Sequence, residues 1–189
     1  MKNFLFFSLT MILSCFILQG QNTVLVTYYS KTGNTEQMAQ AVARGAEKVE
    51  GINVVLKRIE NTTAKDLLDA GAIVVGSPVY NANVAPVVQE FISNWPFEGS
   101  PLKDKLGAAF VTAGGISAGE EVTMLNILTS MLIFNMIVMG GDDWTAPFGA
   151  SGISGEPPFP GEQPIDDVFT QKGEKLGERI ARLLVKMEN

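Results

Sequence analysis

The order of apolar and polar segments along the chain predicts an α/β domain: a doubly wound, five-stranded parallel sheet with helices on both faces. Short apolar runs of strand length alternate with segments of helical spacing, as in layered α/β domains. Residues 72–76 are apolar throughout, as expected of a parallel strand covered on both faces. The 189 residues suit one such domain with a sizeable core.

The first half of the chain contains three predicted strands and two predicted helices. Apolar residues recur at helical spacing after Thr35, from Met38 to Val49, and Thr62 or Thr63 is suited to cap the second helix. In order, the elements are a strand at Val24–Tyr28, a helix from Thr35 to about Lys48, a strand at Ile52–Ile59, a helix at Thr63–Ala70 and a strand at Ala72–Gly76.

The second half continues the alternation. Its predicted elements are a helix at Pro86–Asn94, a strand at Leu106–Thr112, a helix at Glu120–Phe134, a strand at Met136–Met139 and a helix at Asp166–Met187. The segment Gly140–Pro164 is long and rich in Gly and Pro, and it is predicted to be a loop. Its aromatic residues, Trp144, Phe148 and Phe159, leave two interpretations open: a loop packed at a ligand site or subunit contact, or one that covers a sheet edge.

The N-terminal 20 residues have the pattern of a signal peptide. Lys2 supplies a positive start, and Phe4–Leu18 is apolar but too short to span a bilayer. We therefore expect residues 1–20 to be a signal peptide and residues 21–189 to form the mature, exported domain, periplasmic or secreted. Cys15 follows a loose lipoprotein-type sequence, so a lipid anchor at this cysteine ranks second and an uncleaved anchor third.

Composition excludes several classes of function. Fourteen basic against 20 acidic residues give a formal net charge of −6, which disfavours nucleic-acid binding. The chain has no histidine, and its one cysteine lies in the signal-peptide segment. Catalysis by imidazole or thiol, and histidine-ligated metal, are therefore not expected. Chemistry carried by a bound cofactor is favoured, because the protein then supplies only binding, orientation and electrostatics.

The turn from Ser30 to Thr35 is the most informative segment of the chain. It joins a buried strand directly to a helix, and a helix N-terminus offers unpaired N–H groups and a favourable dipole to an anion. Hydroxyls of Ser30, Thr32 and Thr35 add donors, and Gly33 allows an unusual backbone conformation. The spacing of a P-loop and of a dinucleotide fingerprint is absent. Taken alone, the turn is as compatible with simple helix capping as with phosphate binding.

Three turns leave the carboxyl ends of predicted strands, where ligands bind in doubly wound sheets. They are Ser30–Thr35, Ser77–Asn83 and Thr112–Gly119, and all are rich in small, polar or glycine residues. One loop for a phosphate and two for a flat heterocycle describe a site for FMN.

These segments give the chain a resemblance to the flavodoxin-like superfamily, and within it to the WrbA-type NAD(P)H:quinone oxidoreductases. The turn Ser30–Thr35 resembles the family's phosphate loop. The second and third turns are similar to its Gly-Thr-Pro-Thr-Arg-Phe-Gly-Asn and glycine-rich segments. Pro147–Ala150 and Ile153–Gly155 resemble the late Pro-Tyr-Gly-Ala and Ile-Ala-Gly stretches, which are the more specific sign of this branch. The resemblance runs from about Val24 to the C-terminus.

The resemblance implies a set of FMN-binding residues and no catalytic side chain, because the flavin carries the chemistry. The family's Arg and Phe of the second turn are replaced here by Tyr80 and Asn81, and a family tryptophan over the flavin could correspond to Trp95 or Phe97. The implied residues are Ser30, Lys31, Thr32, Gly33, Asn34 and Thr35 at the phosphate, and Pro78, Val79, Tyr80, Asn81, Thr112, Ala113, Gly114 and Gly115 at the ring.

The resemblance further implies an FMN-dependent oxidoreductase that passes electrons from NAD(P)H to a quinone, as a homodimer or homotetramer. The alternative is a flavodoxin-type electron carrier that serves a redox partner protein. A phospho-acceptor receiver domain of the same fold is excluded, because Gly76-Ser77-Pro78 stands where its aspartate would be. A domain that serves only as an interaction module is the remaining alternative.

Overall fold

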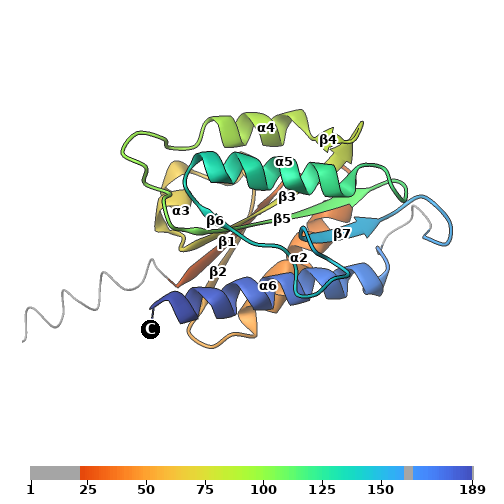
Figure 1. Cartoon of the computed structure of the whole chain (residues 1–189). Helices are drawn as coiled ribbons and strands as arrows, with labels where there is room; N and C mark the ends of the chain where they lie inside the picture. Colours follow the sequence, from red (N-terminus) through yellow and green to blue (C-terminus); the bar gives the residue numbers. More distant parts are fainter. Residues whose placement is uncertain (1–21, 160–163, 189) are drawn as a thin grey trace, which may run out of the picture.

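The computed structural model describes residues 22–159 and 164–188, and its sheet lies between two layers of helices (Figure 1). Helices α2 (Asn34–Glu47) and α6 (Asp167–Glu188) cover one face. Helices α3 (Ala64–Asp69), α4 (Pro86–Ser93) and α5 (Glu120–Ile133) cover the other. The predicted signal peptide lies outside the described residues. Within those ranges, no helix combines the length and apolar character needed to cross a bilayer.

Five parallel strands in doubly wound order confirm the predicted fold class. The order across the sheet is β2-β1-β3-β5-β6. The strands are β1 (Thr23–Tyr28), β2 (Asn53–Arg58), β3 (Ala72–Tyr80), β5 (Leu106–Ala113) and β6 (Ile137–Val138). Strand β2 ends one residue earlier than predicted, because a short 3₁₀ turn, η1 (Ile59–Asn61), begins at Ile59. The central strands β1, β3 and β5 are buried over most of their length, as helices on both faces require.

The fifth strand is shorter than predicted, and a further strand lies in the segment that was predicted to be a loop. Of the predicted strand Met136–Met139, only Ile137 and Val138 pair, and they lie beside the start of β5. A further strand, β7 (Ala150–Ile153), pairs in parallel with the end of β5, from Phe110 to Ala113. The segment Gly140–Pro164 is therefore not only a loop. Its β7 completes the sheet edge at the carboxyl end of β5.

Helices α2 and α6 approach closely because glycines lie at their contact. A Cβ placed on Gly45 would lie 1.9 Å from the carbonyl oxygen of Glu174, and one on Gly177 would lie 1.9 Å from that of Val42. Glu174 also accepts hydrogen bonds from Arg44 and Lys48 on α2. The packing fixes α2, and therefore the loop that precedes it.

Candidate functional site

The turn between β1 and α2 has the geometry of an anion-binding loop. Gly33 is the N-cap of α2 and has a φ of 95°, a conformation that L side chains rarely adopt. Its N–H donates to the Ser30 hydroxyl oxygen at 3.0 Å, which closes the turn on itself. The next N–H groups begin the helix and have no acceptor within it. They point out of the turn together with the positive end of the helix dipole.

Arg58, at the end of β2, supports this loop, although the sequence reasoning did not single it out. Arg58 is the register partner of Tyr28 on the neighbouring strand. Its guanidinium donates to the Ser30 carbonyl oxygen at 2.6 Å and lies 5.6 Å from the centre of the Tyr28 ring. It also forms an ion pair with Glu36 on α2 at 3.3 Å. The sequence offered one indication of this role: Arg58 lies at the end of a strand that was predicted to belong to the same parallel sheet.

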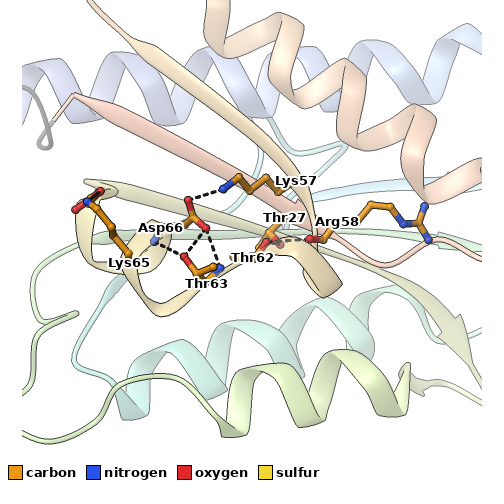
Figure 2. Close-up of polar contacts among 8 residues, drawn as sticks. Thr27, Lys57, Arg58, Thr62, Thr63, Lys65 and Asp66 are labelled. Carbon is orange, nitrogen blue, oxygen red and sulfur yellow. Dashed lines mark hydrogen bonds and ion pairs between the residues drawn. The ribbon is translucent and has the colours of Figure 1, made fainter.

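A polar network holds the end of β2 and the start of α3 in place (Figure 2). The Thr62 hydroxyl donates to the Arg58 carbonyl oxygen at 3.0 Å and shares a hydrogen bond of 2.8 Å with the Thr27 hydroxyl on β1. Thr63, rather than Thr62, caps α3, in a reciprocal capping box with Asp66. Through the Thr62 hydroxyl, the network connects the backbone of Arg58 to Thr27 on β1, the strand that leads into the loop.

Asp66 connects this capping box to β2. Its carboxylate accepts a hydrogen bond from Lys57 at 2.7 Å and another from the backbone N–H of Thr63 at 2.8 Å (Figure 2). Partial burial alone would raise the pKa of Asp66, but these bonds outweigh it and lower the pKa to about 2. The carboxylate is therefore charged throughout the physiological range.

The second predicted loop, Ser77–Asn83, is a β-hairpin, and its prediction as a loop is wrong. Strand β3 continues through Pro78, Val79 and Tyr80, and β4 (Asn83–Val84) returns antiparallel to it. Asn81 and Ala82 form the turn with positive φ values of 51° and 58°. Two-residue hairpin turns favour such values because they match the twist of the strands. The Ser77 hydroxyl fixes the base of the hairpin by accepting the N–H of Ala85 at 3.0 Å.

The hairpin contacts both other loops. Burial and the neighbouring Tyr29 side chain raise the pKa of Tyr80, so the hairpin lies beside the residue that precedes the first loop. At its turn, Ala82 packs against Gly119, where an added Cβ would lie 2.5 Å from the Ala82 Cβ. Tyr29 and Tyr80 thus lie close together where the first loop and the hairpin meet.

The third loop is attached to the first by a buried hydrogen bond. The hydroxyls of Thr35 and Thr112 lie 2.7 Å apart, and both residues are buried. Thr112 and Ala113 belong to β5, so the loop itself begins at Gly114. A Cβ placed on Gly114 would meet no atom within 4 Å, which marks open space beside the backbone. A flat ligand can lie against this stretch.

Residues that follow β7 reach the same place, and the sequence reasoning did not assign them a role in the site. The Asn34 side-chain amide donates to the Ser154 hydroxyl at 2.7 Å, and the Ser154 N–H donates to the Ala113 carbonyl oxygen at 2.9 Å. The Glu156 carboxylate accepts the N–H of Ile116 at 2.6 Å. The resemblance of Ile153–Gly155 to a family stretch was the signal that could have led to them.

The structure brings all three groups of predicted residues to the carboxyl edge of the sheet. Their exposure varies: Ser30, Thr35, Thr112 and Ala113 are buried, Gly33, Asn34, Pro78, Val79 and Gly115 are half-buried, and Lys31, Thr32, Tyr80, Asn81 and Gly114 are exposed. Trp95 and Phe97 lie elsewhere. Trp95 is buried against Phe91 and Phe134, and Phe97 packs on Phe134, which lies near the first residues of β5 and β6. Neither can cover a ligand at this site.

The residues at this edge fit the parts of an FMN molecule. Helix N-terminal amides and hydroxyls suit its phosphate, with Lys31 and Arg58 as nearby positive charges. Asn34 Oδ1 is buried and accepts no hydrogen bond from the described part of the chain, so an acceptor beside the loop is left for a ligand hydroxyl. The open space at Gly114 and the tyrosines of the hairpin suit a planar ring.

Comparison with known proteins agrees with this geometry. Residues 23–151 match the model of the NADPH-dependent FMN reductase family. The chain is 33% identical to a flavodoxin of Aquifex aeolicus (strain VF5), over 84% of the chain and 86% of the relative. It is 29% identical to an NAD(P)H dehydrogenase (quinone) of Geotalea daltonii, over 70% of the chain and 83% of the relative.

A solved structure supports the fold. The WrbA-like flavodoxin of Agrobacterium tumefaciens superimposes with a TM-score of 0.71 at 19% identity, over 87% of the chain and 98% of that protein. Together these matches confirm the flavodoxin-like fold and the expected likeness to the WrbA-type branch.

Proposed function

Because the chain belongs to the family of NADPH-dependent FMN reductases and is an FMN-binding protein of flavodoxin-like fold, we propose that it passes electrons from NAD(P)H to a quinone. The observation that carries this proposal is the junction at the sheet edge. The Thr35–Thr112 hydrogen bond, the Tyr29–Tyr80 contact and the Ala82–Gly119 packing hold the three loops together at the carboxyl edge of the sheet. Likeness to the quinone dehydrogenase of Geotalea daltonii supports the choice of acceptor.

In this function the protein binds and orients, and FMN supplies the electron-transfer chemistry when it is bound. The amides at the start of α2 hold the phosphate, and Arg58 keeps the loop closed through the Ser30 carbonyl. Backbone from Gly114 onward borders one edge of the ring, and Tyr80 borders the other. No side chain of the site is required as a general acid or base, which agrees with the absence of histidine.

A second candidate is a flavodoxin-type carrier that exchanges electrons with a redox partner protein. The 33% identity to the flavodoxin of Aquifex aeolicus favours it. The net charge of −6 would then steer encounters with a basic partner.

Two measurements test the proposal in sequence. Titration of the purified protein with FMN, followed by absorbance, tests the site: shifted flavin bands support it, and unchanged bands at micromolar FMN refute both redox candidates. Steady-state assays with NADH or NADPH and a benzoquinone then separate them. Rapid turnover with one nicotinamide supports the oxidoreductase, whereas FMN binding with negligible turnover supports the carrier.

We also propose that the protein is exported. The basis is the apolar segment of residues 1–20, which precedes the described domain. N-terminal sequencing of protein from the native cell tests this: a mature chain that begins near Gln21 supports a cleaved signal, a chain that begins at a lipidated Cys15 supports the anchored alternative, and an intact Met1 refutes both.

A further inference from the structure

The third loop carries a negative charge that neither the sequence motifs nor the family match assigned to the site. The Glu156 carboxylate accepts the N–H of Ile116 at 2.6 Å. Its Oε2 atom would lie 2.9 Å from a Cβ placed on Gly115. The charge therefore lies against the backbone that is expected to border the ring of FMN.

Glu156 is placed there by a packed turn. The N–H of Gly155 donates to the Phe159 carbonyl oxygen at 2.8 Å, and the N–H of Phe159 donates to the Glu156 carbonyl oxygen at 2.7 Å. The Phe159 ring packs against Phe169 on α6, with ring centres 4.7 Å apart. The backbone of Glu156 is thus fixed through Phe159 to the helix layer, so its carboxylate remains within reach of the loop.

The two ends of the site differ in charge. Lys31 and Arg58 lie at the first loop, where Arg58 is paired with Glu36 and Glu60, whereas residues 112–119 include no basic side chain. Within the described ranges, Glu156 takes part in no ion pair. A phosphate is therefore favoured at one end, and additional negative charge is disfavoured at the other.

We propose that Glu156 controls the reduction potential of FMN in this site by disfavouring its anionic, two-electron-reduced form. This inference rests on the proposed binding of FMN. The oxidised ring is neutral, whereas the reduced ring carries a negative charge at its pyrimidine edge. Glu156 acts against the reduced form twice: its charge repels the anion, and its oxygen occupies an N–H that would otherwise donate to the ring. The oxidised form is nearly unaffected by the charge.

The size of the effect follows from Coulomb's law. Two unit charges about 6 Å apart change a binding ratio by about threefold in bulk water and by about a hundredfold at an effective permittivity of 20. For an exposed carboxylate, we expect an intermediate value of about tenfold. For a two-electron couple, tenfold corresponds to about 30 mV. The effect decreases as ionic strength rises, since salt screens exposed charges.

Two variants separate the charge from the hydrogen bond. Glu156→Gln keeps an acceptor for the Ile116 N–H and removes only the charge, whereas Glu156→Ala removes both. The full-length mature protein is titrated with FMN, and its midpoint potential is measured by spectroelectrochemistry at low and high salt. We expect Glu156→Gln to raise the potential by about 30 mV, equal to tenfold tighter relative binding of reduced FMN. Glu156→Ala is expected to raise it at least as much, while the Kd for oxidised FMN changes by less than about threefold.

The outcomes distinguish this inference from the function on which it rests. Absence of FMN binding by the unmodified protein refutes the proposed function and the inference together. Normal FMN binding with a potential that is unchanged or lower in Glu156→Gln refutes the inference alone. Asp69→Asn is the matched control, because this carboxylate is paired with Lys65 at the end of α3, at the opposite end of the sheet from the loops. If the reduction potential of FMN rises as much in the control variant as in Glu156→Gln, the effect is one of general charge. That result would also refute the inference.

Discussion

The loop between β1 and α2 is closed by a hydrogen bond between its own residues, with Arg58 and Ser154 bonded to it from other elements, whereas the loop after β5 is held by residues from the end of the domain. In the first loop, Gly33 bonds to Ser30 three residues earlier, and α2 begins immediately after it. In the third loop, Ile116 bonds to Glu156 forty residues later, and Ala113, the last residue of β5 before the loop, accepts the N–H of Ser154. The two loops meet at the Thr35–Thr112 hydrogen bond.

This difference separates the roles of the two loops. A loop closed by its own residues is preorganised for a constant group, such as a phosphate. A loop closed by a distant segment takes its electrostatic character from that segment, so its effect on a bound ring can be changed at Glu156 while Gly33 and Ser30 keep the first loop closed. The comparison predicts that changes near β7 act on the third loop and the fold together, whereas changes at Gly33 act mainly on ligand binding.

The largest effect is expected for Gly149→Ala, at the start of β7. Gly149 has a φ of 136°, and an added Cβ would lie 2.1 Å from the carbonyl oxygen of Ala109. Backbone strain and the clash together are expected to lower the free energy of unfolding by about 3 kcal/mol, as measured by urea denaturation. Gly51→Ala is the control, because Gly51 has a φ of 83° with no atom within 4 Å of an added Cβ. Equal losses of unfolding free energy in the two variants would show that the close contact of Gly149 with Ala109 is unimportant.

Gly33→Ala is expected to have the next largest effect. A φ of 95° costs a residue with a side chain about 1–2 kcal/mol, and relaxation of that strain would move the first N–H groups of α2. The Kd for FMN, measured by fluorescence titration, should rise at least about tenfold, with only a modest loss of stability. Gly99→Ala provides a control of similar backbone conformation in an open loop, where φ is 77°. An unchanged Kd would argue against phosphate binding at this turn.

Thr112→Val tests the junction of the two loops. The change removes one partner of a buried 2.7 Å hydrogen bond and leaves the Thr35 hydroxyl unsatisfied, at a cost of about 1.5 kcal/mol. A double-mutant cycle with Thr35→Val measures the coupling between the loops in thermal unfolding. Strict additivity of the two changes would show that the hydroxyls do not interact.

The smallest effect is expected for Asp66→Asn, in the network below the first loop. The pKa of Asp66, about 2 in the folded protein, lies below that of an unfolded aspartate. Its contribution is therefore present above about pH 4 and is lost as the pH falls toward 2. At pH 7 the variant should lose about 1 kcal/mol of unfolding free energy, because a partly buried ion pair and a capping bond are weakened. The unfolding free energies of the unmodified protein and Asp66→Asn should therefore converge as the pH falls. A difference that stays constant from pH 6 to pH 2.5 would show that the charge of Asp66 is not its cause.

The sequence by itself determined the α/β class, the order of the five parallel strands and the glycine turn that precedes α2, because these depend on local patterns. Apolar runs indicate buried strands, and Gly33 before the start of a helix indicates a conformation that few other residues adopt. The cap of α3 was likewise narrowed to two adjacent threonines, of which the structure selects Thr63.

Only the tertiary structure decided the shortened fifth strand and the further strand β7, the hairpin at Ser77–Asn83 and the approach of Arg58 and Glu156 to the loops. Strand β7 has only four residues, and its sequence, Ala-Ser-Gly-Ile, has little strand propensity. It forms because the exposed edge of β5 supplies hydrogen-bond partners that no local pattern records. Arg58 and Glu156 reach the site for the same reason: parallel pairing brings together strand ends that lie far apart in the sequence.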